Sequence, residues 1–128
     1  MEQAIGHKVW AIAEGFIPSY GNGPAPQFTS HEAACILNAS AQDANVKLWI
    51  YFSDRDPIGP YKFLVPAKRT KHLRFNDLHE PEAIPLDTDY ASLIESDVPI
   101  VVQHTRLDSR QAENALISTI AFPVTSSV

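Results

Sequence analysis

The sequence lacks most of what disulfide-rich, secreted and membrane-spanning proteins require. Its single cysteine, Cys35, excludes an internal disulfide and fits a reducing compartment. No apolar run approaches the roughly 18 residues that cross a bilayer. The first residues also lack the basic and apolar regions of a signal peptide. We therefore expect a soluble cytoplasmic protein.

Motifs for catalysis and for metal binding are missing as well. The sequence holds no Gly-x-Ser-x-Gly elbow, no His-Glu-x-x-His pair, no Gly-x-x-x-x-Gly-Lys loop and no Cys-x-x-Cys. Its five histidines show no ligand spacing. His104, Asp108 and Ser109 share one segment in which nothing orients a base. We expect no enzymatic activity, no metal and no cofactor.

Charge of both signs is present but unevenly distributed. The net charge of −5 argues against nucleic acid as the main ligand. Residues 62–74 hold five of the ten cations, whereas residues 75–105 hold seven acids and no Lys or Arg. Both stretches can be solvated surfaces. Otherwise the acidic stretch contacts a cationic partner, and the basic stretch contacts DNA or another subunit. The candidate partner-binding residues are Asp77, Glu80, Glu82, Asp87 and Asp89.

Apolar and alternating segments predict an all-β chain. The expected strands are residues 9–13, 32–38, 46–52, 61–65, 69–75, 100–105 and 115–122. Residues 14–27, rich in Gly and Pro, predict a long loop, and the only helix predicted is Tyr90–Glu95. We expect one domain, residues 1–128, built as an antiparallel β-sandwich of about seven to eight strands, with a frayed tail after Phe122. Exposed edges of such short strands favour oligomers.

A polar segment of twelve residues, Gln103–Asn114, separates two apolar flanks that we expect to form buried strands. If the first strand continues into this segment, His104, Arg106, Asp108 and Arg110 share one face, because side chains alternate along a strand. Such a row indicates a partner-binding surface, a subunit contact or a polar site.

Aromatic, amide and charged side chains near strand ends indicate a candidate polar pocket. This combination suits a hydroxylated ligand, whose apolar ring faces stack while its hydroxyls form hydrogen bonds. The alternative is that Trp10 and Trp49 belong to the core and that the ions pair internally. The candidate ligand-binding residues are Trp10, Glu14, His72, Arg74, Asn76, Gln103, His104, Arg106 and Asp108.

Three parts of the chain together carry a family resemblance. They are Trp10–Pro18 with Tyr20–Pro24, then Tyr51–Asp54 with Gly59–Tyr61, Val65–His72 and Arg74–Leu78, and finally Val98–Ala115. On these segments the chain resembles the sensory rhodopsin transducer family, small soluble proteins typified by the cyanobacterial transducer. The resemblance covers nearly the whole chain.

The resemblance implies a β-sandwich that assembles as a homotetramer and has no enzymatic activity. It also implies a signal transducer that docks on the cytoplasmic face of a microbial sensory rhodopsin and relays the photosignal to a cytoplasmic target. Some members occur without a rhodopsin, and the wider group implies a small sugar-like ligand. The alternative function is therefore a small-ligand-binding β-sandwich module with a link to transcriptional regulation.

Overall fold

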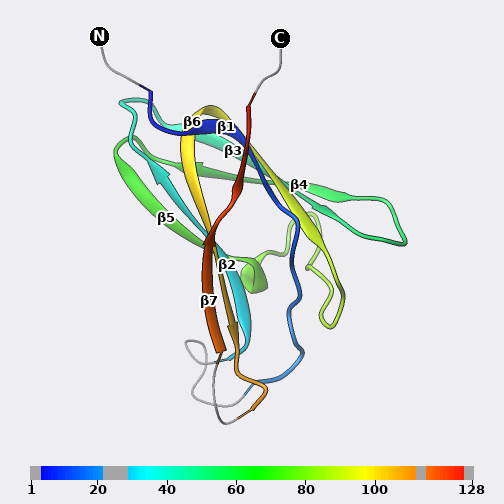
Figure 1. Ribbon diagram of the computed structural model, residues 1–128. Coiled ribbons are helices and arrows are strands. Elements are labelled where there is room, and N and C mark those ends of the chain that lie inside the picture. Colours follow the sequence, from blue (N-terminus) through cyan, green and yellow to red (C-terminus); the bar gives the residue numbers. More distant parts are fainter. Residues whose placement is uncertain (1–3, 22–28, 112–114, 126–128) are drawn as a thin grey trace.

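The computed structural model describes residues 4–21, 29–111 and 115–125, and these residues form an antiparallel β-fold (Figure 1). Apart from the 3-10 turn η1 (Phe75–Asp77), no helix occurs among them. The strands are β1 (His7–Ile12), β2 (His31–Asn38), β3 (Ala44–Tyr51), β4 (Ile58–Val65), β5 (Arg69–Arg74), β6 (Ala91–Asp108), β7 (Ala115–Ile120) and β8 (Phe122–Val124). The predicted loop at residues 14–27 is described only as far as Gly21, and the rest of it lies outside the described residues.

The long strand β6 organises the sheet. Its first half pairs with β3 on one side and β1 on the other, and its second half pairs with β2 and β7. Beyond these neighbours lie β4, which pairs with β3, β8, which pairs with β1, and β5, which pairs with β2. All eight strands thus belong to one sheet, because a single strand passes through both of its halves.

Alternating side chains give the two halves one shared core. In the first half, Leu48, Ile94 and Trp10 are neighbours across three strands, and all three are buried. In the second half, Ile36 pairs with Val102, and neither side chain is exposed. These residues belong to the same buried cluster, so burial of apolar surface holds the two halves together.

The prediction of an all-β antiparallel fold is confirmed, whereas the predicted helix Tyr90–Glu95 is wrong. Residues 91–95 open the 18-residue strand β6, because Ile94 lies between Trp10 and Leu48 in the sheet. A short sequence with an acidic cap favours a helix only weakly, and pairing on both sides overrides that preference. The predicted strand 100–105 is therefore only a part of β6.

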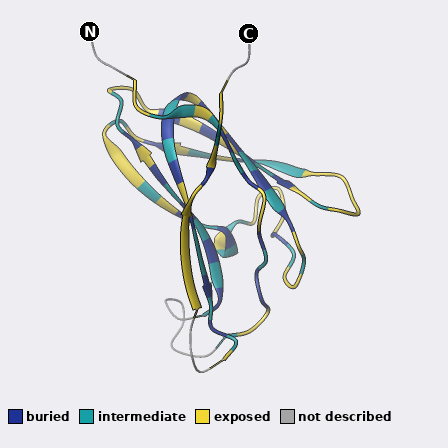
Figure 2. Cartoon of the chain, viewed as in Figure 1, coloured by how far each residue is buried: buried dark blue, intermediate teal, exposed yellow. Residues whose placement is uncertain are grey.

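The end of the chain also differs from expectation. Residues 115–120 form a strand, as predicted, but every one of them is exposed instead of buried (Figure 2). The chain then breaks at the buried Ala121, and Phe122–Val124 continues as β8 alongside β1. The last three residues of the predicted frayed tail lie outside the described residues. Burial cannot be inferred from apolar sequence alone, because an edge strand meets the sheet on one side only.

Candidate functional site

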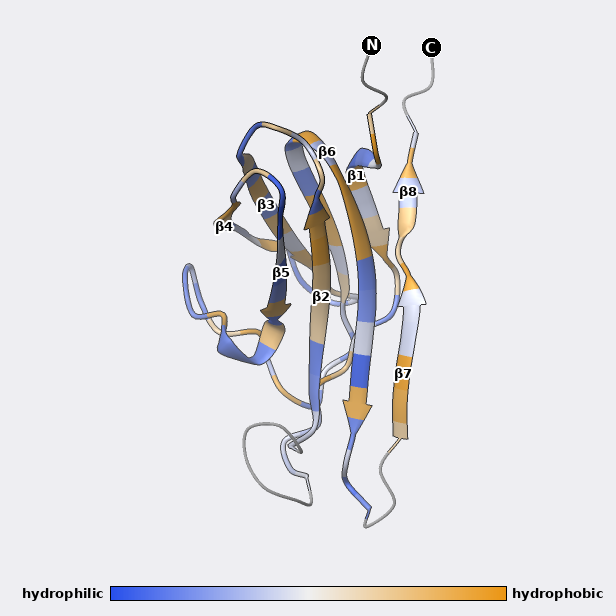
Figure 3. Ribbon diagram, turned by 90° about the vertical axis from the view of Figure 1, so that its left-hand side faces the viewer, coloured by the Kyte–Doolittle hydropathy of each residue, from blue (hydrophilic) through white to orange (hydrophobic). Residues whose placement is uncertain are grey.

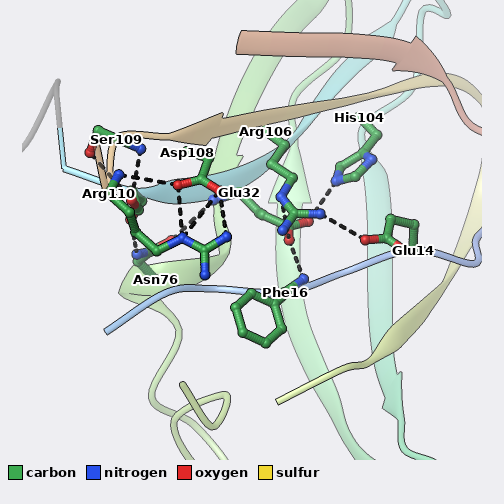
Figure 4. A network of polar contacts seen from close by, with 10 residues as sticks. Glu14, Phe16, Glu32, Asn76, His104, Arg106, Asp108, Ser109 and Arg110 are labelled. Carbon is green, nitrogen blue, oxygen red and sulfur yellow. Dashed lines mark hydrogen bonds and ion pairs between the residues drawn. The ribbon is translucent and has the colours of Figure 1, made fainter. Parts of the chain in front are cut away.

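Charged side chains meet inside the second half of the sheet. Glu32 of β2 is the cross-strand partner of Arg106 of β6, and the next inward position of β6 is His104, which pairs with Ala34. Residues that pair directly across an antiparallel ladder share a face, so these three polar side chains point the same way as the core residue Ile36. With Glu14 they form what we term the charged cluster (Figure 4).

Glu32 is the centre of the charged cluster and has no exposed surface. Its Oε1 accepts a hydrogen bond from His104 Nε2 at 2.6 Å, and its Oε2 accepts one from the backbone N–H of Phe16. Arg106 Nε lies 3.9 Å from the same Oε2, and Arg106 Nη1 donates to Glu14 Oε1 at 2.7 Å. A buried carboxylate needs several such donors to offset the loss of hydration.

Asn76 and Tyr90 complete the surroundings of Glu32. Asn76 Oδ1 accepts the backbone N–H of Glu32 at 3.2 Å, and Asn76 Nδ2 donates to the carbonyl of Ser30 at 3.1 Å. The Tyr90 hydroxyl is buried close to the Glu32 carboxylate. Burial raises the pKa of Tyr90 far above its ordinary value, and the nearby charge of Glu32 adds to the rise. The hydroxyl therefore stays neutral.

The charged cluster holds a segment without regular structure, residues 14–20, which we term the strap. One side of the strap is fixed by Glu14 and Phe16 to the charged cluster. Its other side is bonded to the chain before β6, where Gly15 O accepts from the Tyr90 N–H at 3.0 Å and Ile17 O accepts from the Asp87 N–H at 2.8 Å. The strap thus joins the interior of the sheet to the acidic stretch.

A second ion pair lies at the end of β6. Arg110 binds Asp108 with Nη2 at 2.7 Å from Oδ2 and Nε at 3.0 Å from Oδ1. These hydrogen bonds from Arg110 hold the pKa of Asp108 below its ordinary value. The guanidinium carbons of Arg106 and Arg110 lie 5.8 and 5.6 Å from the centre of the Phe16 ring. Both distances permit a cation–π contact, so the strap is also bound through its aromatic side chain.

The predicted pocket residues are divided among the core, the charged cluster and separate depressions. His72 and Arg74 line a depression of about 490 Å³, together with His31, Ala33, Cys35, Asp77 and Thr105. Asp108 lines another of about 370 Å³, with Tyr20, Arg110, Gln111 and Ala115. Glu14 and His104 border a third of about 220 Å³. The structure brings Glu14, Asn76, His104 and Arg106 together around Glu32 and places the others elsewhere.

Two of the remaining predicted pocket residues lie apart from the charged cluster. Trp10 is buried in the core, where its Nε1 donates to the carbonyls of His7 and Ile100, each at 2.9 Å. Gln103 is exposed on the outer face of β6, opposite Cys35 of β2. The arrangement around Trp10 matches the alternative in which this residue is part of the core.

The candidate partner-binding acids lie on η1 and on the connection from η1 to β6, and all are exposed. Asp77 lies 3.6 Å from Arg74. Asp87 adopts a positive φ of 53°. Its Oδ1 accepts a hydrogen bond from the backbone N–H of Ser19 at 3.0 Å, and since Ser19 belongs to the strap, Asp87 helps to hold the strap in place. We term the stretch Asp77–Asp89, whose five acids are all exposed, the acidic connection.

A family model described as Anabaena sensory rhodopsin transducer matches residues 5–123 of the chain. The chain belongs to this transducer family. It is 64% identical to a solved structure named Anabaena sensory rhodopsin transducer, with a TM-score of 0.75 over 81% of this chain and 100% of that one. A structure described as Thermotoga maritima 1070 shares 30% identity and a TM-score of 0.82, covering 95% of this chain and 98% of that one. No curated protein matches.

Two further observations on this transducer-family chain concern metal ions and membrane-spanning helices. Within residues 4–21, 29–111 and 115–125, no group of three or more His, Cys, Asp or Glu side chains is placed to hold a metal ion. Over the same ranges no helix is long and apolar enough to cross a membrane.

The sequence analysis did not identify Glu32, the residue at the centre of the charged cluster of this chain. The signal was present, because Glu32 lies two residues before Ala34 and four before Ile36, on the inward face of β2. A carboxylate on a buried face requires an internal partner. The contact between Glu32 and the backbone N–H of Phe16 could not be predicted in this way, because side-chain periodicity does not specify the path of a loop.

Proposed function

We propose that this chain is a non-enzymatic signal transducer that binds the cytoplasmic face of a microbial sensory rhodopsin and relays its photosignal to a cytoplasmic target. The family match over residues 5–123 carries this proposal. In it the chain works as a homotetramer in the cytoplasm. The charged cluster supports a role without catalysis, because Glu32 has no exposed surface and its two oxygens are already bonded within the protein.

We assign receptor binding to the acidic connection. Membrane proteins carry an excess of Lys and Arg on their cytoplasmic loops, and an acidic surface is steered toward such loops at low salt. The acids of the acidic connection are exposed, and the connection is bonded to the strap at Asp87. A receptor that contacts this stretch would therefore also act on the strap and, through it, on the charged cluster.

Calorimetric titration with the detergent-solubilised sensory rhodopsin of the same organism tests the proposal. Binding is expected, with an affinity that differs between darkness and illumination, because a transducer responds only if it binds the two receptor states differently. Absence of binding in both conditions would overturn the proposal. Equal affinity in both would overturn the relay of the signal.

A pair of charge-matched variants tests the assignment of the surface. We choose Glu80→Lys/Glu82→Lys and leave Asp87 unchanged, because Asp87 also holds the strap. The double reversal is expected to weaken receptor binding and to flatten its dependence on salt. Asp54→Lys/Asp56→Lys changes the net charge equally in an exposed turn and should leave binding largely intact. Equal effects of the two variants would show that only net charge matters.

A small-ligand-binding module is the second candidate function, and the depression of about 490 Å³ around His72 and Arg74 favours it. Its polar side chains suit a sugar-like ligand with several hydroxyls. Thermal unfolding in the presence of sugars and polyols tests this function, since a ligand at about 100 times its dissociation constant adds about 2.7 kcal/mol. His72→Ala should reduce the shift, whereas His79→Ala, exposed and outside the depression, should not. No shift with any ligand would contradict it.

A further inference from the structure

A hollow lies on the outer face of the second half of the sheet, on the side away from the charged cluster. Ala33 and Cys35 of β2 alternate with the buried Ala34 and Ile36, so their side chains point outward. Both outward side chains are small, and β2 lies between β5 and β6 (Figure 3). Longer side chains on those neighbours form walls around this low floor, and the result is the depression of about 490 Å³.

The wall that β5 contributes is basic. Arg74 is opposite Ala33 and His72 is opposite Cys35, so both side chains stand on the same outward face. β5 belongs to residues 62–74, which hold five of the ten cations of the chain, and the proposed receptor surface does not use this stretch. Among the described residues that line the depression, Asp77 is the only acid. The lining therefore favours a negatively charged ligand.

Asp77 is a loose partner for Arg74. Arg74 Nη1 lies 3.6 Å from Asp77 Oδ1, and the Asp77 side chain is 68% exposed against 24% for Arg74. Arg74 Nη2 donates to Thr29 Oγ1 at 2.9 Å, which holds the guanidinium at the wall. An ion pair with an exposed partner contributes little to stability. An anionic group of a ligand can thus take the place of the Asp77 carboxylate at little cost.

The other side of the depression supplies hydrogen-bond acceptors. His31 Nδ1 lies 2.7 Å from the carbonyl oxygen of Thr29. Since a carbonyl oxygen only accepts, Nδ1 carries the proton, and Nε2 of the neutral ring is an acceptor. Thr105 Oγ1 donates to Ser118 Oγ at 3.4 Å, so its own lone pairs can accept from a ligand. Hydroxyl groups are the ligand donors that match these acceptors.

We propose that this depression binds a small hydroxylated anion, such as a sugar acid or a sugar phosphate, with its anionic group at Arg74 and His72 and its hydroxyls at the opposite wall. The inference rests on the ligand-binding module of the proposed function, whose ligand class it names, and it is independent of receptor binding. The planar guanidinium of Arg presents donors in a fork that matches carboxylate and phosphate. Small-molecule sites occupy about 300–1,000 Å³, and this depression lies in that range.

A small anion fits the depression better than the backbone of a nucleic acid does. Duplex DNA carries phosphates along its whole length and binds to extended groups of cations. Across the depression from Arg74 lie the acceptors of His31 and Thr105, and Asp77 adds a negative charge at its border. Such a lining accommodates one anionic group and repels a row of them.

Calorimetric titration of the full chain without receptor, at low salt, tests the class of ligand. The probes are glucuronate, glucose 6-phosphate and glucose, which differ chiefly in the anionic group. At least one anion should bind about tenfold or more tightly than glucose, because charge-assisted hydrogen bonds add to the same hydroxyl contacts. The anion that binds more tightly identifies carboxylate or phosphate as the recognised group.

Replacement of Asp77 separates a site for anions from a site for neutral sugars. Asp77→Asn should raise the affinity for the anion about two- to fivefold, because it removes a competing carboxylate from Arg74. A neutral sugar bonded to Asp77 would instead lose affinity. Arg74→Gln should lower the affinity for the anion about tenfold or more. Asp54→Asn and Arg55→Gln are the matched controls, since this Arg–Asp pair lies in an exposed turn, and neither should change binding.

The exposed Asp77 keeps the test independent of folding, because its replacement leaves the bond between Arg74 and Thr29 in place. Glucose that binds as tightly as both anions, or weaker anion binding by Asp77→Asn, would overturn the anion and leave the ligand-binding module standing. Absence of binding by all three probes would overturn the inference and the sugar-like ligand together. Failure of receptor binding leaves these results unchanged.

Discussion

His104 Nε2 lies 2.6 Å from Glu32 Oε1, and neither side chain is more than 9% exposed. The contact joins β2 to β6 inside the second half of the sheet, and the other Glu32 oxygen binds the strap at Phe16. A buried polar group stabilises a structure only while all of its partners are present. The position of the strap therefore depends on a pair of residues that are 72 positions apart in the sequence.

Glu32→Gln should destabilise the fold strongly. The substitution keeps the size of the side chain but removes the negative charge that His104, Arg106 and the Phe16 N–H face. Removing one partner of a buried ion pair costs about 3 to 5 kcal/mol. Urea unfolding at neutral pH measures the change. Glu14→Gln is the matched control, because Glu14 is 70% exposed in its pair with Arg106, and it should cost at most about 1 kcal/mol.

Asp108→Asn should change the dependence of stability on acid. Hydrogen bonds from Arg110 lower the pKa of Asp108 in the folded state. A lowered folded pKa stabilises the protein above the ordinary Asp pKa of about 3.9, and that contribution is lost as the pH falls through the folded pKa. The variant should thus be less stable than the wild type at neutral pH and equal to it in strong acid. Asp56→Asn, in an exposed turn, controls for the loss of a charge.

Substitution of the two tryptophans should lower stability by different amounts. Trp10→Phe leaves the buried carbonyl of Ile100 without its indole donor and should cost about 1 to 3 kcal/mol. Trp49 is half-buried and donates to the exposed Glu95 at 2.8 Å, so Trp49→Phe should cost less than about 1 kcal/mol. Acrylamide should quench the fluorescence of Trp49 in the first variant more than that of Trp10 in the second. Equal quenching would contradict the burial of Trp10.

Gly15→Ala should destabilise the junction of the strap with β6. A Cβ at Gly15 would lie 2.6 Å from Cδ1 and Cζ of Tyr90, whose ring is buried. Crowding of this kind costs about 1 to 3 kcal/mol. In a double-mutant cycle, Gly15→Ala should cost less when Tyr90 is also replaced by Ala, because the clash is then relieved. Additive losses in unfolding free energy would contradict the contact.

Part of the polar interior was predictable from the sequence. Alternation predicted the row His104, Arg106, Asp108 and Arg110. The structure places His104 and Arg106 around one carboxylate, and β6 ends at Asp108, before Arg110. That carboxylate, Glu32, could have been found as an acid on the inward face of an apolar strand. The strap could not, because its position depends on backbone contacts with residues 87 and 90, which leave no periodic pattern.

Local chain properties determined what the sequence alone could establish. Alternation of apolar residues and clusters of Gly and Pro specify an antiparallel β-fold and most strand positions, because both act over a few neighbouring residues. Tertiary structure decided that residues 91–108 form one strand and that β7 is exposed. Those outcomes depend on which strands pair with β6 and β7. Pairing between distant segments cannot be predicted from any short stretch of the sequence.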